Sequence, residues 1–327
     1  MNVLVTGGAG YIGSHTVLAL IEAGHHVTVF DDLSSGHEEN LPPKAHFVLG
    51  DISDTPSLKR LLSASQYDAV MHFAALKAAG ESMEAPQLYA AQNTAASLQL
   101  LHQVLHHQIP YFVFSSSAAV YGEPEALPIH ENHPKKPTNY YGFTKLQIEQ
   151  NLHWFSQLKG LRYASLRYFN AAGYDLDGRI TRLERGSYNL IPILMEVAVG
   201  KRSSLEIFGN DYPTPDGTCI RDYVHVTDLA QAHCLALDYL ARENQDLEVN
   251  LGTGRGHSVM EVLASVRKMT GQTIAANIAP RRPGDPAMLF AASDKAGKLM
   301  HWQPEITDLD TLVDSTWQVY KRSYLKG

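Results

Sequence analysis

A glycine-rich turn between an apolar run and a helical stretch constrains the fold of this chain more than any other feature. Asn2–Thr6 is expected to form a buried strand, the turn follows as Gly7-Gly8-Ala9-Gly10-Tyr11-Ile12-Gly13, and a helix extends through Ile21. Glycine is needed where the backbone turns sharply, where it approaches a phosphate, and where a helix packs closely on a strand. The free N–H groups at the start of such a helix attract phosphate oxygens. The turn therefore predicts a dinucleotide site at the edge of a parallel sheet.

Short apolar runs alternate with amphipathic stretches along the first half of the chain. This alternation is typical of a parallel sheet with helices on both faces. Further strands are expected at residues 26–31, 47–51, 69–74, 111–115 and 163–168, and long helices at 87–107 and 140–158. The sequence therefore predicts an α/β protein built on a Rossmann-type, doubly wound parallel sheet.

The pattern changes after Asn170. A loop rich in Gly, Arg and Asp (173–188) separates the strand–helix series from a mixture of short helices, short strands and Pro/Gly-rich loops. A chain of 327 residues is long enough for two domains. We expect a dinucleotide-binding domain over residues 1–172 and a smaller C-terminal α/β substrate domain over 173–327, with part of 215–250 packing back on the first domain.

Composition and charge exclude several classes of protein. The formal net charge is −7 and no Lys/Arg tract is longer than Arg281-Arg282, so no nucleic-acid partner is expected. The apolar stretches are strand-sized, well short of the ~18–20 residues that span a bilayer. The N-terminus begins as a strand rather than as a signal peptide. With Cys219 and Cys234 too few for a disulfide framework, these features predict a cytoplasmic protein without a membrane partner.

A metal site is not expected. His102 and His106 are four residues apart near a predicted helix end, but no carboxylate or cysteine with ligand spacing accompanies them. Histidines at a helix C-terminus are favoured by the helix dipole. His15, just inside the first helix, is expected to be a packing residue.

Asp31 ends the second predicted strand. It follows Gly13 by 31 − 13 = 18 residues, close to the ~20 at which a carboxylate accepts hydrogen bonds from an adenosine ribose. A carboxylate there repels a 2′-phosphate, so NAD is favoured over NADP. The alternative is a charged strand end that only caps the following loop.

Tyr141 and Lys145 are four residues apart on a predicted helix, so their side chains share one face. A phenol with a pKa of ~10 is a poor base at neutral pH. The charges of Lys145 and of an oxidised nicotinamide would stabilise the phenolate and lower that pKa. The alternative is an ordinary half-exposed helix face. Tyr140 is a weaker candidate because its partner at the same spacing is Thr144.

Three consecutive serines, Ser115, Ser116 and Ser117, come directly after an apolar strand. In open α/β sheets, ligands bind beyond the carboxyl ends of the strands. A hydroxyl at this position could relay a proton between a substrate and Tyr141. The alternative is a polar turn that hydrogen-bonds to its own backbone.

With these motifs in place, the chain resembles the extended short-chain dehydrogenase/reductases and, within them, the UDP-glucose (UDP-galactose) 4-epimerase family. The resemblance extends over nearly the whole length, through VTGGAGYIGSHT, GDI, HFAALKAAGES, FSSSAAVYG, YGFTK, LRYFNAAG, NLIP, IFGNDYPTPDGTCIRDYVHVTDLA, NLGTG and APRRPGD. It implies a Rossmann-type NAD domain, a smaller sugar-nucleotide domain, and 4-epimerisation of UDP-hexoses through a 4-keto intermediate. NAD is the implied cofactor and a UDP-hexose the implied substrate. A homodimer through the helices at 87–107 and 140–158 is implied as well, with a monomer that buries these helices in its own core as the alternative.

The resemblance also implies the site residues. Tyr141 would be the catalytic base and acid, Lys145 its partner on the nicotinamide ribose, and Ser117 the hydroxyl that orients or relays the proton. The implied NAD-binding residues are Gly7, Gly10, Tyr11, Ile12, Gly13, Asp31, Asp32, Leu33, Ser34, Ser35, Gly36, Asp51, Ile52, Phe73, Ala74, Ala75, Leu76, Lys77, Asn93, Ser115, Tyr141, Lys145 and Phe169. The implied substrate-binding residues are Lys77, Ser117, Tyr141, Asn170, Asn189, Leu190, Glu206, Ile207, Phe208, Arg221, Arg282, Asp285 and Leu289.

Within the substrate set, Arg221 and Arg282 match cations on the UDP diphosphate, which suits the guanidinium fork. Phe208 matches a neighbour of the uracil ring, and Asp285 a contact of the uridine ribose. The alternative for Arg221 is a surface ion pair with Asp222.

Two departures from the family leave the choice of substrate open. Ala119 stands where the family usually has Thr, and Leu289 stands where side-chain bulk bears on whether N-acetylated hexoses fit. A 4-epimerase of UDP-N-acetylhexosamines or UDP-pentoses is therefore an alternative. A nucleotide-sugar 4,6-dehydratase would need an acid where this chain has Ala118 and Ala119. A non-catalytic NAD sensor would not need the pair Tyr141 and Lys145.

Overall fold

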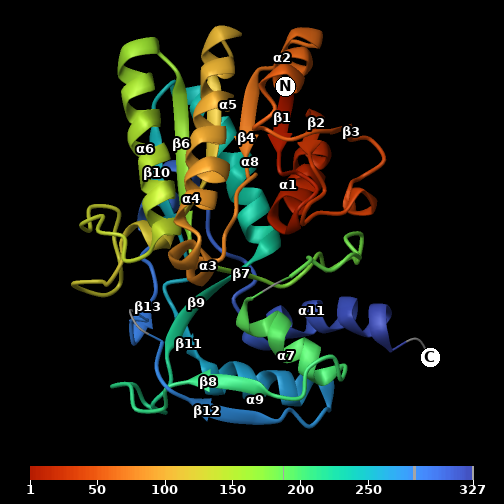
Figure 1. The fold of residues 1–327 in the computed structure, drawn as a ribbon, viewed down its shortest axis with the longest axis vertical. Helices are drawn as coiled ribbons and strands as arrows, with labels where there is room; N and C mark the ends of the chain where they lie inside the picture. Colours follow the sequence, from red (N-terminus) through yellow and green to blue (C-terminus); the bar gives the residue numbers. More distant parts are fainter. Residues whose placement is uncertain (187, 283–284, 326–327) are drawn as a thin grey trace.

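The computed structural model describes residues 1–186, 188–282 and 285–325. Its largest feature is a seven-stranded sheet in the order β10-β6-β5-β4-β1-β2-β3, in which every neighbouring pair is parallel (Figure 1). The strands are β1 (Asn2–Thr6), β2 (His26–Asp31), β3 (His46–Leu49), β4 (Ala69–His72), β5 (Tyr111–Ser117), β6 (Arg162–Tyr168) and β10 (Leu247–Leu251). The strand order reverses between β1 and β4, so ligands are expected beyond the carboxyl ends of these two strands. The predicted doubly wound sheet is confirmed.

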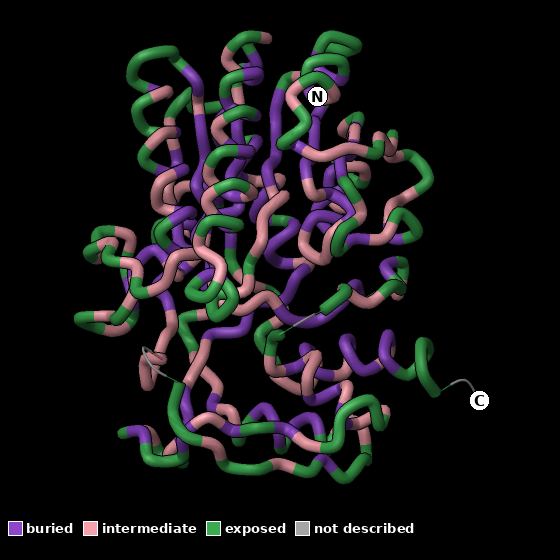
Figure 2. The backbone as a smooth tube through the Cα atoms, in the orientation of Figure 1, coloured by how far each residue is buried: buried purple, intermediate pink, exposed green. Residues whose placement is uncertain are grey.

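Helices cover both faces of this sheet because successive side chains of each strand point to opposite sides. Val3 and Val5 of β1 belong to one apolar cluster, whereas Leu4 belongs to the other. The first cluster is covered by α1 (Tyr11–Glu22), α8 (Val226–Glu243) and α10 (Asp294–Met300), and the second by α2 (Thr55–Ala64), α5 (Ala96–His106) and α6 (Tyr140–Lys159). Figure 2 shows the strands as mostly buried traces between helices with exposed outer turns.

The stretch predicted as one helix over 87–107 is helical but irregular. It consists of α4 (Pro86–Tyr89), a π-helical turn (Ala90–Ala95) and α5, and the short helix α3 (Ala79–Glu84) precedes it. A π turn holds an extra residue and is frequent at functional sites. Here it contains Asn93, which is buried.

A second layer lies beyond the carboxyl ends of the sheet (Figure 1). It contains β7 (Asn170–Ala172), β9 (Ile220–His225), β11 (Gly256–Ser258) and β13 (Met288–Leu289) in one small sheet, and β8 (Leu205–Phe208) with β12 (Ala276–Ala279) in another. The helices α7 (Leu190–Ala198), α9 (Val259–Thr270) and α11 (Leu309–Tyr324) share a third apolar cluster with these strands. Two 3-10 turns, η1 (Glu38–Asn40) and η3 (Ala118–Val120), complete the described elements.

The chain crosses between the two layers more than once. After β9 it returns through α8 and β10, and β10 pairs in parallel with β6 at the edge of the large sheet. None of the helices in the described ranges has both the length and the apolar character needed to cross a membrane.

Candidate active site

The glycine-rich turn brings three backbone segments into close approach. Gly7 has φ of 72°, and a Cβ there would lie 2.4 Å from the Ala74 nitrogen. A Cβ at Gly13 would lie 2.2 Å from the Gly7 oxygen, so α1 packs directly on the turn. Gly10 is the N-cap residue of α1, and no side chain of the described residues caps this end. The first N–H groups of α1 therefore face the turn, which is the arrangement that binds a pyrophosphate.

Asp31 ties this turn to the loop after β2. Its buried carboxylate accepts hydrogen bonds from the backbone nitrogens of Ala9 (2.9 Å) and Leu33 (2.8 Å). Burial raises the pKa of this carboxyl, and the two backbone hydrogen bonds oppose the rise. Asp31 therefore does cap its own loop. A carboxylate has about four acceptor positions, so this role does not exclude a contact with a ribose.

Asn93 braces the loop that follows β4. Its side-chain oxygen accepts from the Leu76 nitrogen (2.8 Å), and its nitrogen donates to the Leu76 carbonyl (2.9 Å) and to Thr144 Oγ1 (3.2 Å). The loop that contains Ala74, Ala75 and Lys77 is thus held against α6.

Tyr141 and Lys145 lie on the face of α6 that meets β5. Lys145 Nζ donates to the Ser115 carbonyl at 2.9 Å and lies 5.8 Å from the centre of the Tyr141 ring. A Cβ at Gly142 would lie 2.3 Å from the Ala119 oxygen, so only glycine allows α6 to approach the end of β5 this closely. The predicted shared face is confirmed.

Burial dominates the acidity of both Tyr141 and Lys145. Burial raises the pKa of Tyr141, although its hydrogen bond with Ser117 opposes the rise. Burial also lowers the pKa of Lys145 to about 7, against the opposing charge of Glu149. The chain by itself therefore keeps the phenol protonated. Lowering the Tyr141 pKa requires the second positive charge that the sequence analysis invoked, that of an oxidised nicotinamide.

The three serines at the end of β5 have different partners. Ser115 Oγ is hydrogen-bonded to the Tyr168 hydroxyl, and Ser116 Oγ donates to Glu149 at 2.6 Å. Ser117 accepts from the Ala119 nitrogen at 3.1 Å and is hydrogen-bonded to Tyr141. Ser117 is thus the hydroxyl that adjoins the phenol.

The other predicted NAD residues surround this core. Asp32 caps the following turn through the Ser34 nitrogen (2.9 Å), and Gly36 lies so close to Ala9 that a Cβ would be 2.5 Å from its oxygen. Asp51 accepts from the Ser53 nitrogen at 2.8 Å, and Ile52 is buried in the second apolar cluster. Phe73 follows β4, with its ring centre 4.7 Å from that of His233.

Residues 173–185, which we call the strap, cross the loops of the predicted NAD site. At its start the Tyr11 hydroxyl donates to the Gly173 carbonyl at 2.5 Å. In its middle the Asn40 side chain accepts from the nitrogens of Thr181 (3.2 Å) and Arg182 (2.8 Å) and donates to the Arg182 carbonyl (3.0 Å).

The end of the strap reaches the loops after β2 and β4. The Arg185 guanidinium donates to the Leu33 carbonyl at 3.1 Å, its backbone nitrogen donates to the Ser35 carbonyl at 3.5 Å, and Glu184 forms an ion pair with Lys77. The sequence analysis did not single out Asn40 or Glu184, because neither belongs to a motif. Asn40 and Glu184 have partners 142 and 107 residues away along the chain.

The predicted substrate residues gather in the second layer. Asn170 donates to the Asp222 carbonyl at 2.9 Å, Asn189 is the N-cap residue of α7, and Leu190 is its first residue. Glu206, Ile207 and Phe208 lie on β8, and the Arg282 guanidinium lies 3.8 Å from the centre of the Phe208 ring. Leu289 packs in a small apolar cluster with Val120, Tyr121 and Ile129, while Phe169 packs on the same cluster.

Arg221 forms an ion pair with Asp285. The alternative pairing with Asp222 is wrong, because the Asp222 carboxylate instead accepts from Thr253 Oγ1 (2.7 Å) and from the Ala291 nitrogen (3.2 Å). Among the described residues, no three His, Cys, Asp or Glu side chains converge to hold a metal ion.

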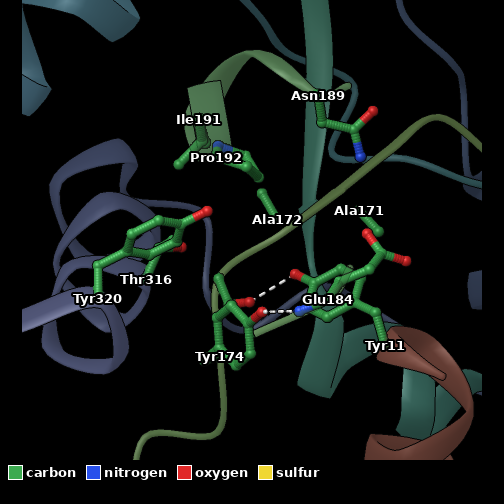
Figure 3. Close-up of a pocket in the computed structure, with 11 residues that line it drawn as sticks. Tyr11, Ala171, Ala172, Tyr174, Glu184, Asn189, Ile191, Pro192, Thr316 and Tyr320 are labelled. Carbon is green, nitrogen blue, oxygen red and sulfur yellow. Dashed lines mark hydrogen bonds between the residues drawn. The ribbon is translucent and has the colours of Figure 1, made fainter. Parts of the chain in front are cut away.

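A cavity of about 20 Å³ marks where the two predicted sets meet (Figure 3). Tyr11, from the cofactor set, and Asn189, from the substrate set, both line it, together with Glu184 and Tyr174 of the strap. In this view the Glu184 nitrogen donates to the Tyr174 hydroxyl, at 3.4 Å. The space suffices for about one water molecule.

Comparison with known proteins identifies the family. Residues 3–252 match the model of the NAD dependent epimerase/dehydratase family. The chain belongs to this family. It is 49% identical to a UDP-glucose 4-epimerase of Halalkalibacterium halodurans, over 98% of this chain and 96% of that protein. It is 45% identical to the UDP-glucose 4-epimerase of Lacticaseibacillus casei, over 97% of this chain and 96% of that protein.

Solved structures agree. The UDP-glucose 4-epimerase of Brucella ovis in complex with NAD superposes with a TM-score of 0.94, at 43% identity and 98% coverage of both chains. The enzyme of Bifidobacterium longum in complex with NAD⁺ and UDP gives 0.92 at 37% identity, over 99% of this chain and 98% of that one.

The residues of this chain fit NAD, the cofactor of the family. The turn at Gly7 and Gly13 packs too closely for a Cβ, and the N-terminus of α1 beside it has no side-chain cap from the described residues, which suits a pyrophosphate. The Asp31 carboxylate retains free acceptor positions at the end of β2, where an adenosine ribose is expected. NAD is therefore the cofactor of this protein.

Proposed function

We propose that this chain catalyses the reversible 4-epimerisation of UDP-glucose and UDP-galactose. The observation that supports this most directly is the position of Tyr141, beside Ser117 and above a Lys145 ammonium held by the Ser115 carbonyl. These groups stand at the carboxyl edge of the sheet, next to the NAD site. Relatives at 41–49% identity named UDP-glucose 4-epimerase support the same reaction.

Tyr141 is proposed to move the proton of the sugar 4-hydroxyl. As the phenolate it takes this proton, directly or through Ser117, and it later returns the proton to the oxygen of the 4-keto group after the sugar has turned over. NAD⁺, when bound, would accept the hydride from C4 of the sugar and supply it again to the opposite face of C4. Lys145 is proposed to keep the phenolate stable and to hold the nicotinamide ribose, while Ser117 orients the hydroxyl.

The hexose must turn over between the two halves of the reaction, so the UDP portion has to be anchored elsewhere. We propose Arg221 and Arg282 as the cations on the diphosphate, Phe208 as the neighbour of the uracil, and Asp285 as the contact of the uridine ribose. Asn170, Asn189 and Leu190 would contact the substrate near the reacting sugar. Because an arginine fork binds phosphate bidentately, rotation can occur about the diphosphate without release.

UDP-N-acetylhexosamine is a second candidate substrate. A UDP-Glc/GlcNAc 4-epimerase of Campylobacter jejuni superposes on this chain with a TM-score of 0.87 at 39% identity. Leu289 packs on Val120 and Tyr121, so its side chain is turned to an apolar cluster. A competition assay of UDP-galactose against UDP-N-acetylgalactosamine would separate these substrates.

The proposed reaction is tested with purified protein and UDP-galactose. We expect formation of UDP-glucose together with reduced-nicotinamide absorbance of the bound cofactor. A chain that binds NAD but neither reduces it nor interconverts the two sugars would instead be a non-catalytic sensor.

We also propose a homodimer that works in the cytoplasm. Trp154 and Leu158 lie one helical turn apart on α6 and are 57% and 67% exposed, so together they offer an apolar surface that a second copy could cover. Light scattering of the purified protein would test the assembly, since a monomeric mass would contradict it.

A further inference from the structure

Glu149 is a buried carboxylate one helical turn after Lys145 on α6, and the proposed mechanism does not use it. Arg167 of β6 holds it bidentately, with Nε donating to Oε1 at 2.7 Å and Nη2 donating to Oε2 at 2.8 Å. Ser116 Oγ also donates to Oε1, at 2.6 Å. Arg167 is fully buried, and Lys135 Nζ lies 3.7 Å from Glu149 Oε2, so this carboxylate is held in place by two cationic side chains.

These bonds form an ordered series along the end of β5. The Ser115 carbonyl accepts from Lys145, the Ser116 hydroxyl donates to Glu149, and the Ser117 hydroxyl adjoins Tyr141. Three consecutive residues of one strand thus meet three side chains of one helix. A shift of α6 along β5 would break all three contacts together.

We propose that Glu149 is a positioning residue for the epimerisation. It fixes α6 against the end of β5, and its carboxylate, one helical turn away, opposes the loss of positive charge from Lys145 beside Tyr141. This proposal rests on the proposed function because it concerns the same reaction. The charge on Lys145 can be measured whether or not that reaction occurs.

The groups around Lys145 in the described residues include no anion other than Glu149. On α6 the titratable neighbours are Tyr141 and Glu149. From β4 comes His72, whose pKa is about 3 because it is buried near the Lys145 charge, so it is neutral.

The strands β5 and β6 add no second anion beside Lys145. From β5 come the Ser115 carbonyl and the Phe114 ring, whose centre lies 4.9 Å from Nζ. From β6 comes the Tyr168 phenol, whose pKa is raised by burial, while Arg167 lies behind the carboxylate. Among the described residues, Glu149 is the one carboxylate that raises the pKa of Lys145.

The test compares three variants of the holoenzyme. Glu149→Gln keeps the shape and removes the charge, whereas Glu149→Asp keeps the charge and shortens the reach. Glu248→Gln is the matched control, because Glu248 also bonds Arg167 Nη2, at 2.5 Å, from β10. Epimerase kcat and KM are measured against pH for each.

For Glu149→Gln we expect the alkaline limb of kcat to move about one to three pH units toward acid, since removing an adjacent anion lowers the pKa of an ammonium by about that amount. KM for UDP-galactose should change less than about twofold, because the residue does not touch substrate. Glu149→Asp should return the alkaline limb of the kcat profile to the pH of the parent protein, while kcat itself stays below the parent value. Glu248→Gln should keep the parent limb.

A second readout does not depend on activity. The ¹³Cε resonance of Lys145, assigned with Lys145→Arg, reports the pKa of the amine directly, and it should titrate at lower pH in Glu149→Gln than in the parent. An unchanged Lys145 titration and an unchanged limb in a folded Glu149→Gln would overturn the proposal. If the unsubstituted protein were inactive while the Lys145 titration shifted as expected, the proposed reaction would be overturned and the role of Glu149 beside Lys145 would stand.

Discussion

The cofactor side and the substrate side of this site are built differently. On the cofactor side, Asp31 and Asn93 are buried and bonded to backbone groups, and Lys145 is held by a carbonyl. On the substrate side, Arg221 is paired with Asp285, and Arg282 lies on Phe208. The cofactor side is thus preformed, whereas the arginines proposed for UDP are bound to other side chains. Binding of UDP must exchange these partners, and that exchange lowers the net affinity.

The largest effect is expected at the reacting group, where the two sides meet. Tyr141→Phe removes the proton carrier but keeps the ring, so kcat should fall by about 10²–10⁴-fold. NAD content should stay near that of the parent. Tyr140→Phe is the matched control and should keep nearly full activity, since Lys145 lies by the ring of Tyr141. A fully active Tyr141→Phe would remove the proposed mechanism.

A substitution on the substrate side should weaken the binding of UDP and leave the binding of NAD unchanged. Arg221→Met removes a charged hydrogen-bond donor to the diphosphate, and such bonds contribute about 1.5–3 kcal/mol. The Kd for UDP, measured by titration calorimetry, should therefore rise about 10- to 100-fold, with NAD binding unchanged. Arg202→Met removes an exposed arginine that is paired with Glu196 outside the predicted site, so it is the control for general loss of positive charge. Equal losses of UDP and NAD affinity would contradict the division.

The sequence predicted the cofactor side better than the substrate side, for a physical reason. Gly7–Gly13, Asp31 and the pair Tyr141 and Lys145 act through local geometry, so their spacing along the chain is informative. Arg221 and Asp285 are 64 residues apart, and their pairing depends on where β9 lies. Asn40 was missed because its partners are in the strap.

The same reason explains the errors in the fold. Strands β1, β2, β5 and β6 are short, mostly buried segments bounded by turn residues, and their positions were predicted to within a few residues. The π turn at Ala90–Ala95 was not predicted, because helical periodicity does not distinguish it from an α-helix. The effect of burial on Tyr141 was not predicted either, since burial is invisible in a spacing pattern; here it raises the pKa of the phenol against the hydrogen bond with Ser117.

Weakening the strap should affect the cofactor side alone. Asn40→Ala removes three hydrogen bonds between η1 and residues 181–182, each with a net contribution of about 0.5–1.5 kcal/mol. The rate of NAD release, followed by loss of cofactor on dilution, should rise by about tenfold. Thr270→Ala, remote on α9, is a control for general destabilisation. Unchanged release in the Asn40 variant would show that the strap does not retain NAD.

The smallest expected effect is on the folding stability of the protein at acidic pH. Burial lowers the pKa of His15 and His225 to about 4 and that of His72 to about 3, from 6.5. The unfolded chain therefore binds more protons than the folded one between about pH 6.5 and 4, so stability is complete above this window and is lost as the pH falls through it.

Melting temperature should accordingly decrease from pH 7 to pH 5. His15→Gln should have a shallower dependence, because His15 Nε2 must stay unprotonated to accept from the Asp175 nitrogen, at 3.1 Å. A parallel pH dependence in both proteins would show that His15 titrates normally.

The place of β10 in the sheet has a consequence for any attempt to truncate the protein. Residues 1–172 alone would leave β6 as an unprotected edge strand, a template for pairing with other chains. They would also lack Glu248 and Asn250, which bond Arg167 and Tyr121. The 74 residues between β7 and β10 (246 − 172 = 74) therefore lie within one folding unit, and a shortened fragment would aggregate rather than bind dinucleotide.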